Sequence, residues 1–203
     1  EIHMKRRDIM SKLYFRYGAM NSGKSTNLMQ VAYNYEERGM KVLLIKPSTD
    51  KKGGDKLVSR LGVERKVDLL INDDQNIYNE VKKWQDEKYK IDCILVDEVQ
   101  FFKAYQIDQL FEIAVCLDIP VICYGLRTDF KMQGFEGSTR LLLLAHSIEE
   151  LKTICKCGKK AILNGRKING KFVFEGEQVA IDNIDNVEYE SLCGHCYFKF
   201  KNQ

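Results

Sequence analysis

The sequence lacks the features that would place the protein in a membrane or on a nucleic acid. An apolar run such as residues 141–145 is far shorter than the roughly 20 residues needed to span a bilayer. The net charge is only +3, and basic residues are interleaved with acidic ones, as on a solvated surface. No apolar segment typical of a signal peptide lies near the amino terminus. We therefore expect a cytoplasmic protein with no membrane partner and no nucleic-acid partner.

Internal repeats and low-complexity tracts are also absent. A chain of 203 residues, 44% hydrophobic and 30% charged, suits one globular domain with a small appendage. The first three residues resemble a vector remnant, so Met4 is taken as the native start. Near residue 148 the character of the chain changes, and short segments rich in glycine and cysteine follow. We expect one domain over residues 4–148 and a smaller one over residues 149–203.

The first part of the chain alternates between strand and helix patterns. Apolar segments typical of strands buried on both faces lie at residues 13–17, 41–46, 91–96 and 120–124, with a shorter one at 67–71. Helical periodicity lies between them, at residues 24–38, 75–87 and 104–117. This alternation predicts an α/β fold, a parallel sheet flanked by helices on both faces. Ligands in such folds bind beyond the carboxyl ends of the strands.

One motif of eight residues fits the phosphate-binding loop pattern G-x-x-x-x-G-K-[ST], between a predicted strand and a predicted helix. Its glycines let backbone N–H groups point inward, where they and the positive end of the helix cradle phosphate oxygens. Lys24 would reach the β- and γ-phosphates, and the Ser25 hydroxyl would ligate Mg²⁺. We therefore expect a nucleoside triphosphate site formed by Gly18, Ala19, Met20, Asn21, Ser22, Gly23, Lys24 and Ser25.

Two carboxylates follow the apolar segment that ends at Val96. An acid at such a strand end holds Mg²⁺ beside the phosphates, so Asp97 is expected there. Successive side chains on a strand point opposite ways, so Glu98 would face an incoming nucleophile as a general base. That nucleophile is water in an ATPase and a substrate hydroxyl in a kinase, and the two acids do not choose between them.

The seven cysteines, with no secretion signal, indicate a reducing compartment. Three lie in apolar segments and are expected in the core: Cys93, Cys116 and Cys123. The other four form two close pairs about 36 positions apart and can close a tetrahedral structural zinc site: Cys155, Cys157, Cys193 and Cys196. Because the first pair has the tight spacing C-x-C, His195 is an alternative to Cys157 as the fourth ligand.

Taken together, four parts of the chain resemble the cytosolic-type (type II) thymidine kinase family. They are the segment from Gly18 to Ser25, Asp97-Glu98-Val99-Gln100-Phe101-Phe102, Tyr124-Gly125-Leu126-Arg127-Thr128-Asp129-Phe130, and Tyr189 ahead of Cys193 and Cys196. The resemblance covers nearly the whole chain in the correct order. It implies a recombinase-like P-loop NTPase core and a small C-terminal zinc-binding domain whose loop covers the nucleoside. The pair Cys155-Lys156-Cys157 departs from the family's usual C-x-x-C.

The resemblance implies that ATP donates its γ-phosphate to the 5′-hydroxyl of thymidine or deoxyuridine, in pyrimidine salvage for DNA synthesis. Glu98 matches the family's catalytic base. Ser25, Asp97 and Asp50 match groups around Mg²⁺. The implied cofactors are ATP, Mg²⁺ and a structural Zn²⁺, and the implied assembly is a homotetramer.

The resemblance also implies a pocket for the nucleoside. A covering loop within about residues 164–189 would close that pocket and read the edge of the base through backbone groups. Aromatic walls suit a flat pyrimidine. The side chains that match the family's pocket are Met20, Phe101, Leu126, Phe130 and Tyr189.

Two other functions stay open at this point. A P-loop ATPase could use a zinc ribbon to contact nucleic acid or a partner protein, with Glu98 activating water. Residues 171–191 are mainly acidic, which disfavours a nucleic-acid module. A kinase for another deoxynucleoside, such as deoxycytidine, is hard to separate by residues alone.

Overall fold

The computed structural model describes residues 10–49, 56–58, 62, 64–179 and 186–203. Its centre is a six-stranded sheet in the order β5-β2-β6-β7-β1-β8. Every pairing between neighbouring strands in this sheet is parallel. The predicted α/β fold with a parallel sheet is therefore confirmed. The strands are β1 (Leu13–Tyr17), β2 (Val42–Pro47), β5 (Leu69–Ile71), β6 (Cys93–Val96), β7 (Val121–Gly125) and β8 (Ser147–Glu150).

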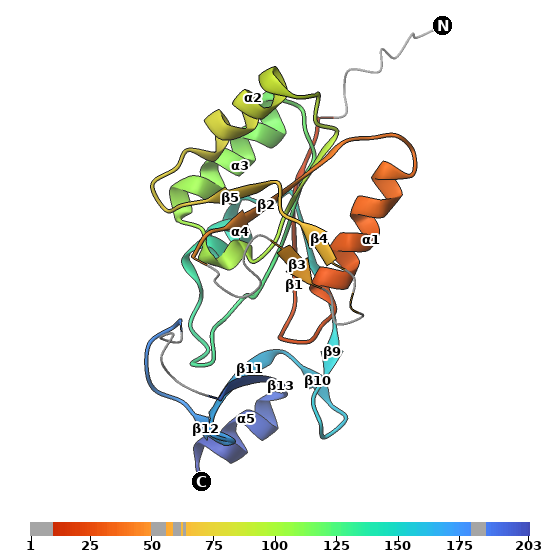
Figure 1. Ribbon diagram of the computed structural model, residues 1–203. Coiled ribbons are helices and arrows are strands. Elements are labelled where there is room, and N and C mark those ends of the chain that lie inside the picture. The colour runs from red at the N-terminus through yellow and green to blue at the C-terminus, as the bar shows by residue number, and fades with distance from the viewer. Residues whose placement is uncertain (1–9, 50–55, 59–61, 63, 180–185) are drawn as a thin grey trace, which may run out of the picture.

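Helices cover both faces of this sheet (Figure 1). On one face, α1 (Lys24–Glu36) buries Leu28 and Ala32 against strand residues such as Leu44. On the other face lie α2 (Ile77–Glu87), α3 (Ala104–Cys116) and α4 (Glu136–Leu144). Alternate residues of β2 enter the two clusters, Leu43 on one side and Leu44 on the other. Burial on both sides explains why the central strands are continuous apolar runs.

The cysteine predictions for the core are partly wrong. Cys93 and Cys123 are fully buried, as expected, but Cys116 is exposed. The buried stripe of α3 consists of Gln106, Ile107, Leu110, Ile113 and Ala114. Cys116 falls outside that stripe on a helix of 3.6 residues per turn, so an apolar sequence context alone did not locate it.

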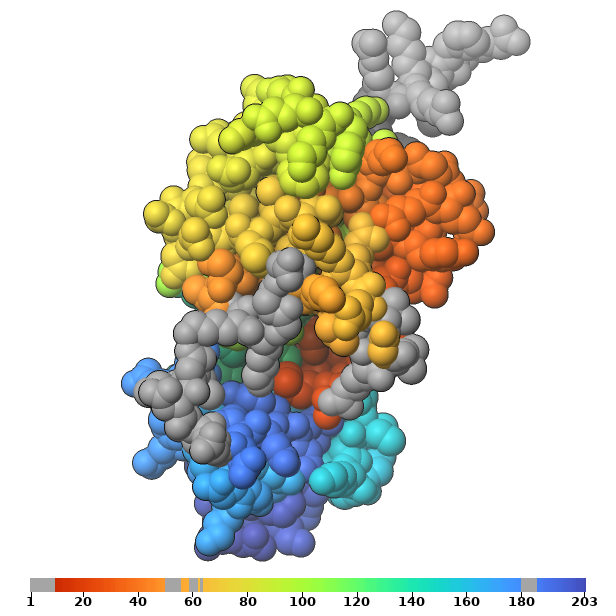
Figure 2. All heavy atoms as spheres, viewed as in Figure 1, coloured from red at the N-terminus to blue at the C-terminus, as the bar shows by residue number. Residues whose placement is uncertain are grey.

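The C-terminal part has its own small sheet and core. Strands β11 (Leu163–Ile168), β12 (Lys171–Val173) and β13 (Val187–Leu192) pair antiparallel in the order β12-β11-β13. Beside them lie the pair β9 (Thr153–Ile154) and β10 (Lys160–Ala161), and the helix α5 (Gly194–Lys201). Figure 2 shows this part, in cyan and blue, next to red atoms of the segment that contains β1 and the phosphate loop.

Several elements were not predicted from the sequence. They are α4, β8, strands β11 and β13 of the small C-terminal sheet, and the hairpin of β3 (Lys56–Val58) and β4 (Glu64–Lys66). An extended segment at residues 171–175 is expected from the sequence, and β12 lies within it. Strand β8 pairs with β1, and the domain boundary predicted after residue 148 falls inside this strand. The division of the chain into two domains stays a prediction. Within the described ranges, no helix is both long enough and apolar enough to cross a bilayer.

Candidate active site

The ends of three parallel strands are joined by hydrogen bonds at one edge of the sheet. The N–H of Gly18, after β1, donates to the carbonyl of Gly125 at the end of β7 at 3.3 Å. The N–H of Leu126 donates to the side-chain oxygen of Gln100, after β6, at 3.1 Å. The phosphate-loop motif and the acids after β6 therefore share the edge at which α/β folds bind ligands.

The phosphate loop turns tightly from β1 into α1. Asn21 and Gly23 have left-handed backbones, with φ of 67° and 79°. A Cβ atom on Gly18 would lie 2.3 Å from Ser22 Oγ and 2.5 Å from the carbonyl oxygen of Leu151, so only glycine fits there. Helix α1 starts without a side-chain cap and without an acid in its first turn, which leaves its positive end open to an anion.

Lys24 is folded inside this loop. Its side chain is buried, and Nζ donates to the carbonyls of Gly18 at 3.1 Å and Ala19 at 2.9 Å, and to Ser22 Oγ at 3.4 Å. The loop thus concentrates an ammonium group, backbone amides and a helix end within a few residues. This donor set fits the oxygens of a polyphosphate.

Asp97 and Glu98 lie just beyond β6 and differ in their surroundings. Asp97 is buried, and its N–H donates to the carbonyl of Ile45 on β2 at 3.0 Å. Glu98 is half-buried and has a left-handed backbone with φ 47° and ψ 38°. The chain turns at Glu98 into the 3₁₀ helix η1 (Val99–Phe101). The side chain of Asp97 is therefore buried at the strand end, whereas that of Glu98 is partly exposed. Oε2 of Glu98 accepts a hydrogen bond from Gln100 Nε2.

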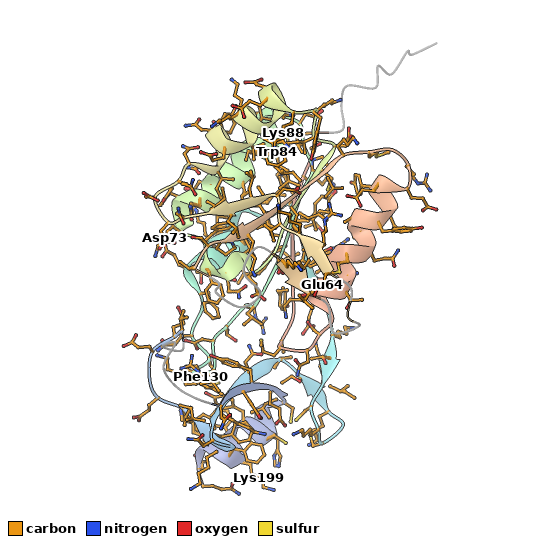
Figure 3. All side chains as sticks on the ribbon, in the orientation of Figure 1. Glu64, Asp73, Trp84, Lys88, Phe130 and Lys199 are labelled. Carbon is orange, nitrogen blue, oxygen red and sulfur yellow. The ribbon has the colours of Figure 1, made fainter. Side chains whose placement is uncertain are left out.

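The candidate pocket residues lie on four segments of the chain around this edge. Phe101 is half-buried and meets Phe135 edge to face, with ring centroids 5.6 Å apart. Leu126 and Phe130 follow β7 and are buried, at 9% and 1% exposure. Met20 is part of the phosphate loop, and Tyr189 is on β13. Figure 3 shows Phe130 between the main sheet and the C-terminal strands.

Arg166 on β11 connects these aromatics to the segment after β12. The guanidinium lies 3.8 Å from the centroid of Phe130 and donates from Nε to the Tyr189 hydroxyl at 3.0 Å. Its other nitrogens donate to the carbonyls of Glu177 and Gln178, both at 2.7 Å. The side chain is buried, and no local pattern in the sequence signalled this role.

Asn164, also on β11, ties the C-terminal part to the phosphate loop. Its Oδ1 accepts from the N–H of Met20 at 2.7 Å, and its Nδ2 donates to the carbonyl of Thr128 at 2.9 Å. The amide is buried and satisfied on both sides. One residue of the small sheet therefore bridges the loops after β1 and β7. Sequence reasoning missed it because its partners are 144 and 36 positions away.

The structure brings Cys155, Cys157, Cys193 and Cys196 together. Their sulfur atoms lie within 4.8 Å of one another, and Cys157 Sγ is 3.5 Å from Cys193 Sγ. Zn–S bonds of about 2.3 Å in a tetrahedron place sulfurs about 3.8 Å apart, so this donor set fits zinc. The N–H of Cys196 donates to Cys193 Sγ at 3.4 Å, and this bond, together with contacts from the other three cysteine side chains, lowers the pKa of that thiol to about 7. His195 is exposed and is not in this group.

Asp50, the third expected magnesium group, lies outside the described residues. Its position relative to Ser25 and Asp97 stays a prediction.

The model of the family described as thymidine kinase matches residues 11–197, which include every element of this site. The chain belongs to the thymidine kinase family. The match runs through both the main sheet and the cysteine cluster, so the family spans the α/β part and the C-terminal part together.

Named thymidine kinases resemble this chain over most of their length. One from Francisella tularensis subsp. holarctica is 45% identical over 189 residues, which cover 91% of this chain and 95% of that protein. One from Enterobacteria phage T4 is 46% identical, covering 91% of this chain and 94% of the phage protein. One from Legionella pneumophila (strain Paris) is 47% identical, covering 91% and 88%.

Solved structures outside the thymidine kinase family are more distant. AMPPCP-bound DnaA from Aquifex aeolicus matches with a TM-score of 0.41 and 15% identity, covering 73% of this chain and 42% of that chain. The Pif1 helicase from Candida albicans matches with a TM-score of 0.41 and 18% identity, covering 71% and 36%.

Proposed function

We propose that this protein transfers the γ-phosphoryl group of ATP to the 5′-hydroxyl of thymidine or deoxyuridine. The 5′-oxygen forms a bond to the γ-phosphorus, the bond from that phosphorus to the β–γ bridging oxygen breaks, and the hydroxyl proton goes to a base. The products are ADP and the nucleoside 5′-monophosphate. Membership of the thymidine kinase family supports this reaction.

The triphosphate end of the site is the phosphate loop. Bound ATP supplies the phosphoryl group, and Mg²⁺ neutralises charge on its oxygens. Lys24 would exchange its present carbonyl partners for phosphate oxygens, while the loop amides and the start of α1 hold the remaining charge. Ser25 and Asp97, together with Asp50, would hold the metal ion.

Glu98 is the proposed general base. It is half-buried at the end of β6, which β7 separates from β1 and the phosphate loop, and its carboxylate is held by Gln100. Phosphoryl transfer needs mainly positioning and charge neutralisation, so one oriented carboxylate on the acceptor hydroxyl is sufficient on the protein's side.

The nucleoside would lie among Met20, Phe101, Leu126, Phe130 and Tyr189. Asn164 and Arg166 support this arrangement, since Asn164 ties Met20 to β11 and Arg166 contacts both Phe130 and Tyr189. The carbonyls of Glu177 and Gln178, held by Arg166, keep the segment after β12 beside the pocket. We assign this segment to the loop that covers the nucleoside.

The four-cysteine cluster would hold a structural Zn²⁺. Four thiolates leave no position for water or substrate, so the metal would stabilise the C-terminal part rather than react. By resemblance to the family we also propose a homotetramer in the cytoplasm.

The observation that carries the proposal is the joining of three strand ends, in which Gly18, Gly125, Gln100 and Leu126 connect the phosphate loop to the acids after β6. The test is ADP release in the presence of ATP, Mg²⁺ and one deoxynucleoside at a time. We expect release that depends on thymidine or deoxyuridine. Equal release without any nucleoside would indicate an ATPase and overturn the proposal.

A further inference from the structure

Gln100 connects the candidate base to the neighbouring strand through a single amide. Its Nε2 donates to Oε2 of Glu98, and its Oε1 accepts from the N–H of Leu126 at 3.1 Å. An N–H group can only donate, so the amide oxygen must face Leu126 and the NH₂ group must face the carboxylate. The orientation of the amide is therefore determined by its two partners.

The surroundings of Gln100 leave this amide little freedom. The side chain is only 2% exposed. A Cβ atom on Gly125 would lie 2.5 Å from Gln100 Oε1, and one on Gly137 would lie 2.5 Å from the carbonyl oxygen of Val99. Two glycines, from β7 and α4, thus let the backbone close around the turn that carries Gln100. The Ser138 hydroxyl donates to the carbonyl of Leu126, so both backbone groups of Leu126 are held.

Glu98 itself needs such support. Its left-handed backbone, with φ 47° and ψ 38°, is unfavourable for a residue with a side chain. It persists only when neighbouring contacts determine it. The N–H of Phe101 donates to the carbonyl of Glu98 at 3.1 Å and closes the turn of η1, which leaves the direction of the carboxylate to be set by Gln100.

We propose that Gln100 is a positioning residue for the Glu98 carboxylate. Its amide would occupy one carboxylate oxygen and leave the other to accept the proton of the nucleophile. This inference rests on the proposed role of Glu98 as base, and it predicts that Gln100 acts on the rate of the chemical step rather than on substrate affinity.

The test is a double-mutant cycle with Glu98→Gln. Gln100→Met has a similar volume and lacks both hydrogen bonds. We expect it to lower kcat at least 10-fold in the otherwise unchanged enzyme, with the KM for ATP and thymidine within about 2-fold, and to lower kcat less than 2-fold in the Glu98→Gln background. If Gln100→Met lowers kcat by the same factor in both backgrounds, the two substitutions act independently. That result would overturn the proposal, because it would indicate a general structural role for Gln100.

A matched control exists in Gln106. It is also fully buried and bonded at both ends, with Nε2 donating to the carbonyls of Asn72 and Gln75 and Oε1 accepting from the N–H of Lys103. Gln106→Met should lower the melting temperature as Gln100→Met does but leave kcat within about 2-fold in both backgrounds. An equal loss of kcat in both glutamine variants would contradict a specific role for Gln100.

If Gln100→Met fails to fold, Gln100→Asn replaces it, since the shorter amide cannot span Glu98 and Leu126 together. The same cycle separates this inference from the proposed function. If the unchanged enzyme releases ADP without any nucleoside, the proposed function fails, but the coupling of Gln100 to Glu98 is then measured on that hydrolysis. If turnover depends on thymidine but the effects of Gln100→Met and Glu98→Gln on kcat are independent, only the inference about Gln100 is overturned.

Discussion

The guanidinium of Arg166 lies 3.8 Å from the ring centroid of Phe130 and holds the carbonyls of Glu177 and Gln178, each at 2.7 Å. One buried cation therefore covers an aromatic residue of the candidate pocket and fastens the segment proposed to cover the nucleoside. Stacking of a guanidinium on an aromatic face is favourable, and its planar fork suits two adjacent carbonyls.

We expect Arg166→Met to raise the KM for thymidine roughly 10-fold or more, because three hydrogen bonds from a charged group are lost, two of them to the proposed covering segment. The KM for ATP should stay within a few-fold, since Lys24 and the phosphate loop are not touched. Steady-state kinetics with each substrate varied in turn measures both values. Lys167→Met is the control: this neighbour on β11 bonds to Glu190 instead and should leave the KM for thymidine nearly unchanged. A change confined to the KM for ATP would contradict the assignment.

The sequence predicted the parts of the structure whose signals are local. Strands buried on both faces, such as β6, are continuous apolar runs, and the phosphate loop and cysteine pairs have fixed spacings. Strand β8 was missed because Ser-Ile-Glu-Glu is a short, mostly exposed strand at the edge of the sheet, where neither alternation nor a long apolar run develops. The roles of Gln100, Asn164 and Arg166 depend on partners brought together by the fold, and no spacing rule reports those.

Lys24 offers a direct test of the phosphate site. Lys24→Met should raise the KM for ATP roughly 10- to 100-fold, the effect of losing a charged hydrogen bond of about 1.5–3 kcal/mol. Equilibrium binding of a non-hydrolysable ATP analogue measures the same loss without turnover. Lys82→Met, on the exposed side of α2, should bind the analogue as the unchanged protein does. Unaltered analogue affinity in the Lys24 variant would remove this lysine from the site.

Asn164 should contribute to both stability and the site. Asn164→Leu leaves the N–H of Met20 and the carbonyl of Thr128 without this buried partner, and we expect the free energy of unfolding to fall by about 1–3 kcal/mol. Urea unfolding followed by circular dichroism measures this change. Asn34→Leu, at an exposed position of α1, should change it by less than about 0.5 kcal/mol. Similar values for the two variants would show that the bridge from Asn164 adds no stability.

From the cluster of four cysteine sulfurs we predict about one zinc ion per chain, with a cysteine rather than His195 as the fourth ligand. Cys157→Ser should reduce the zinc content and lower the melting temperature, because metal binding stabilises a part with a small core. His195→Ala should retain both values, since its exposed side chain lies outside the group of four sulfurs. Metal analysis of the purified variants decides between them, and loss of zinc in the His195 variant alone would contradict the four-cysteine site.

Glu98 is the residue on which the proposed chemistry depends. Glu98→Gln keeps the shape of the side chain but cannot accept the hydroxyl proton, so kcat should fall by about 10²–10⁴-fold, the usual contribution of a general base. Binding of the ATP analogue should be unaffected. A variant that retains full kcat would exclude Glu98 as the base.

The most direct measurement is the identity and amount of the products formed from ATP and thymidine in one reaction. We predict one thymidine 5′-monophosphate for each ADP with the unchanged protein, and almost none of either with Glu98→Gln. ADP accompanied by inorganic phosphate and unaltered thymidine would contradict the account.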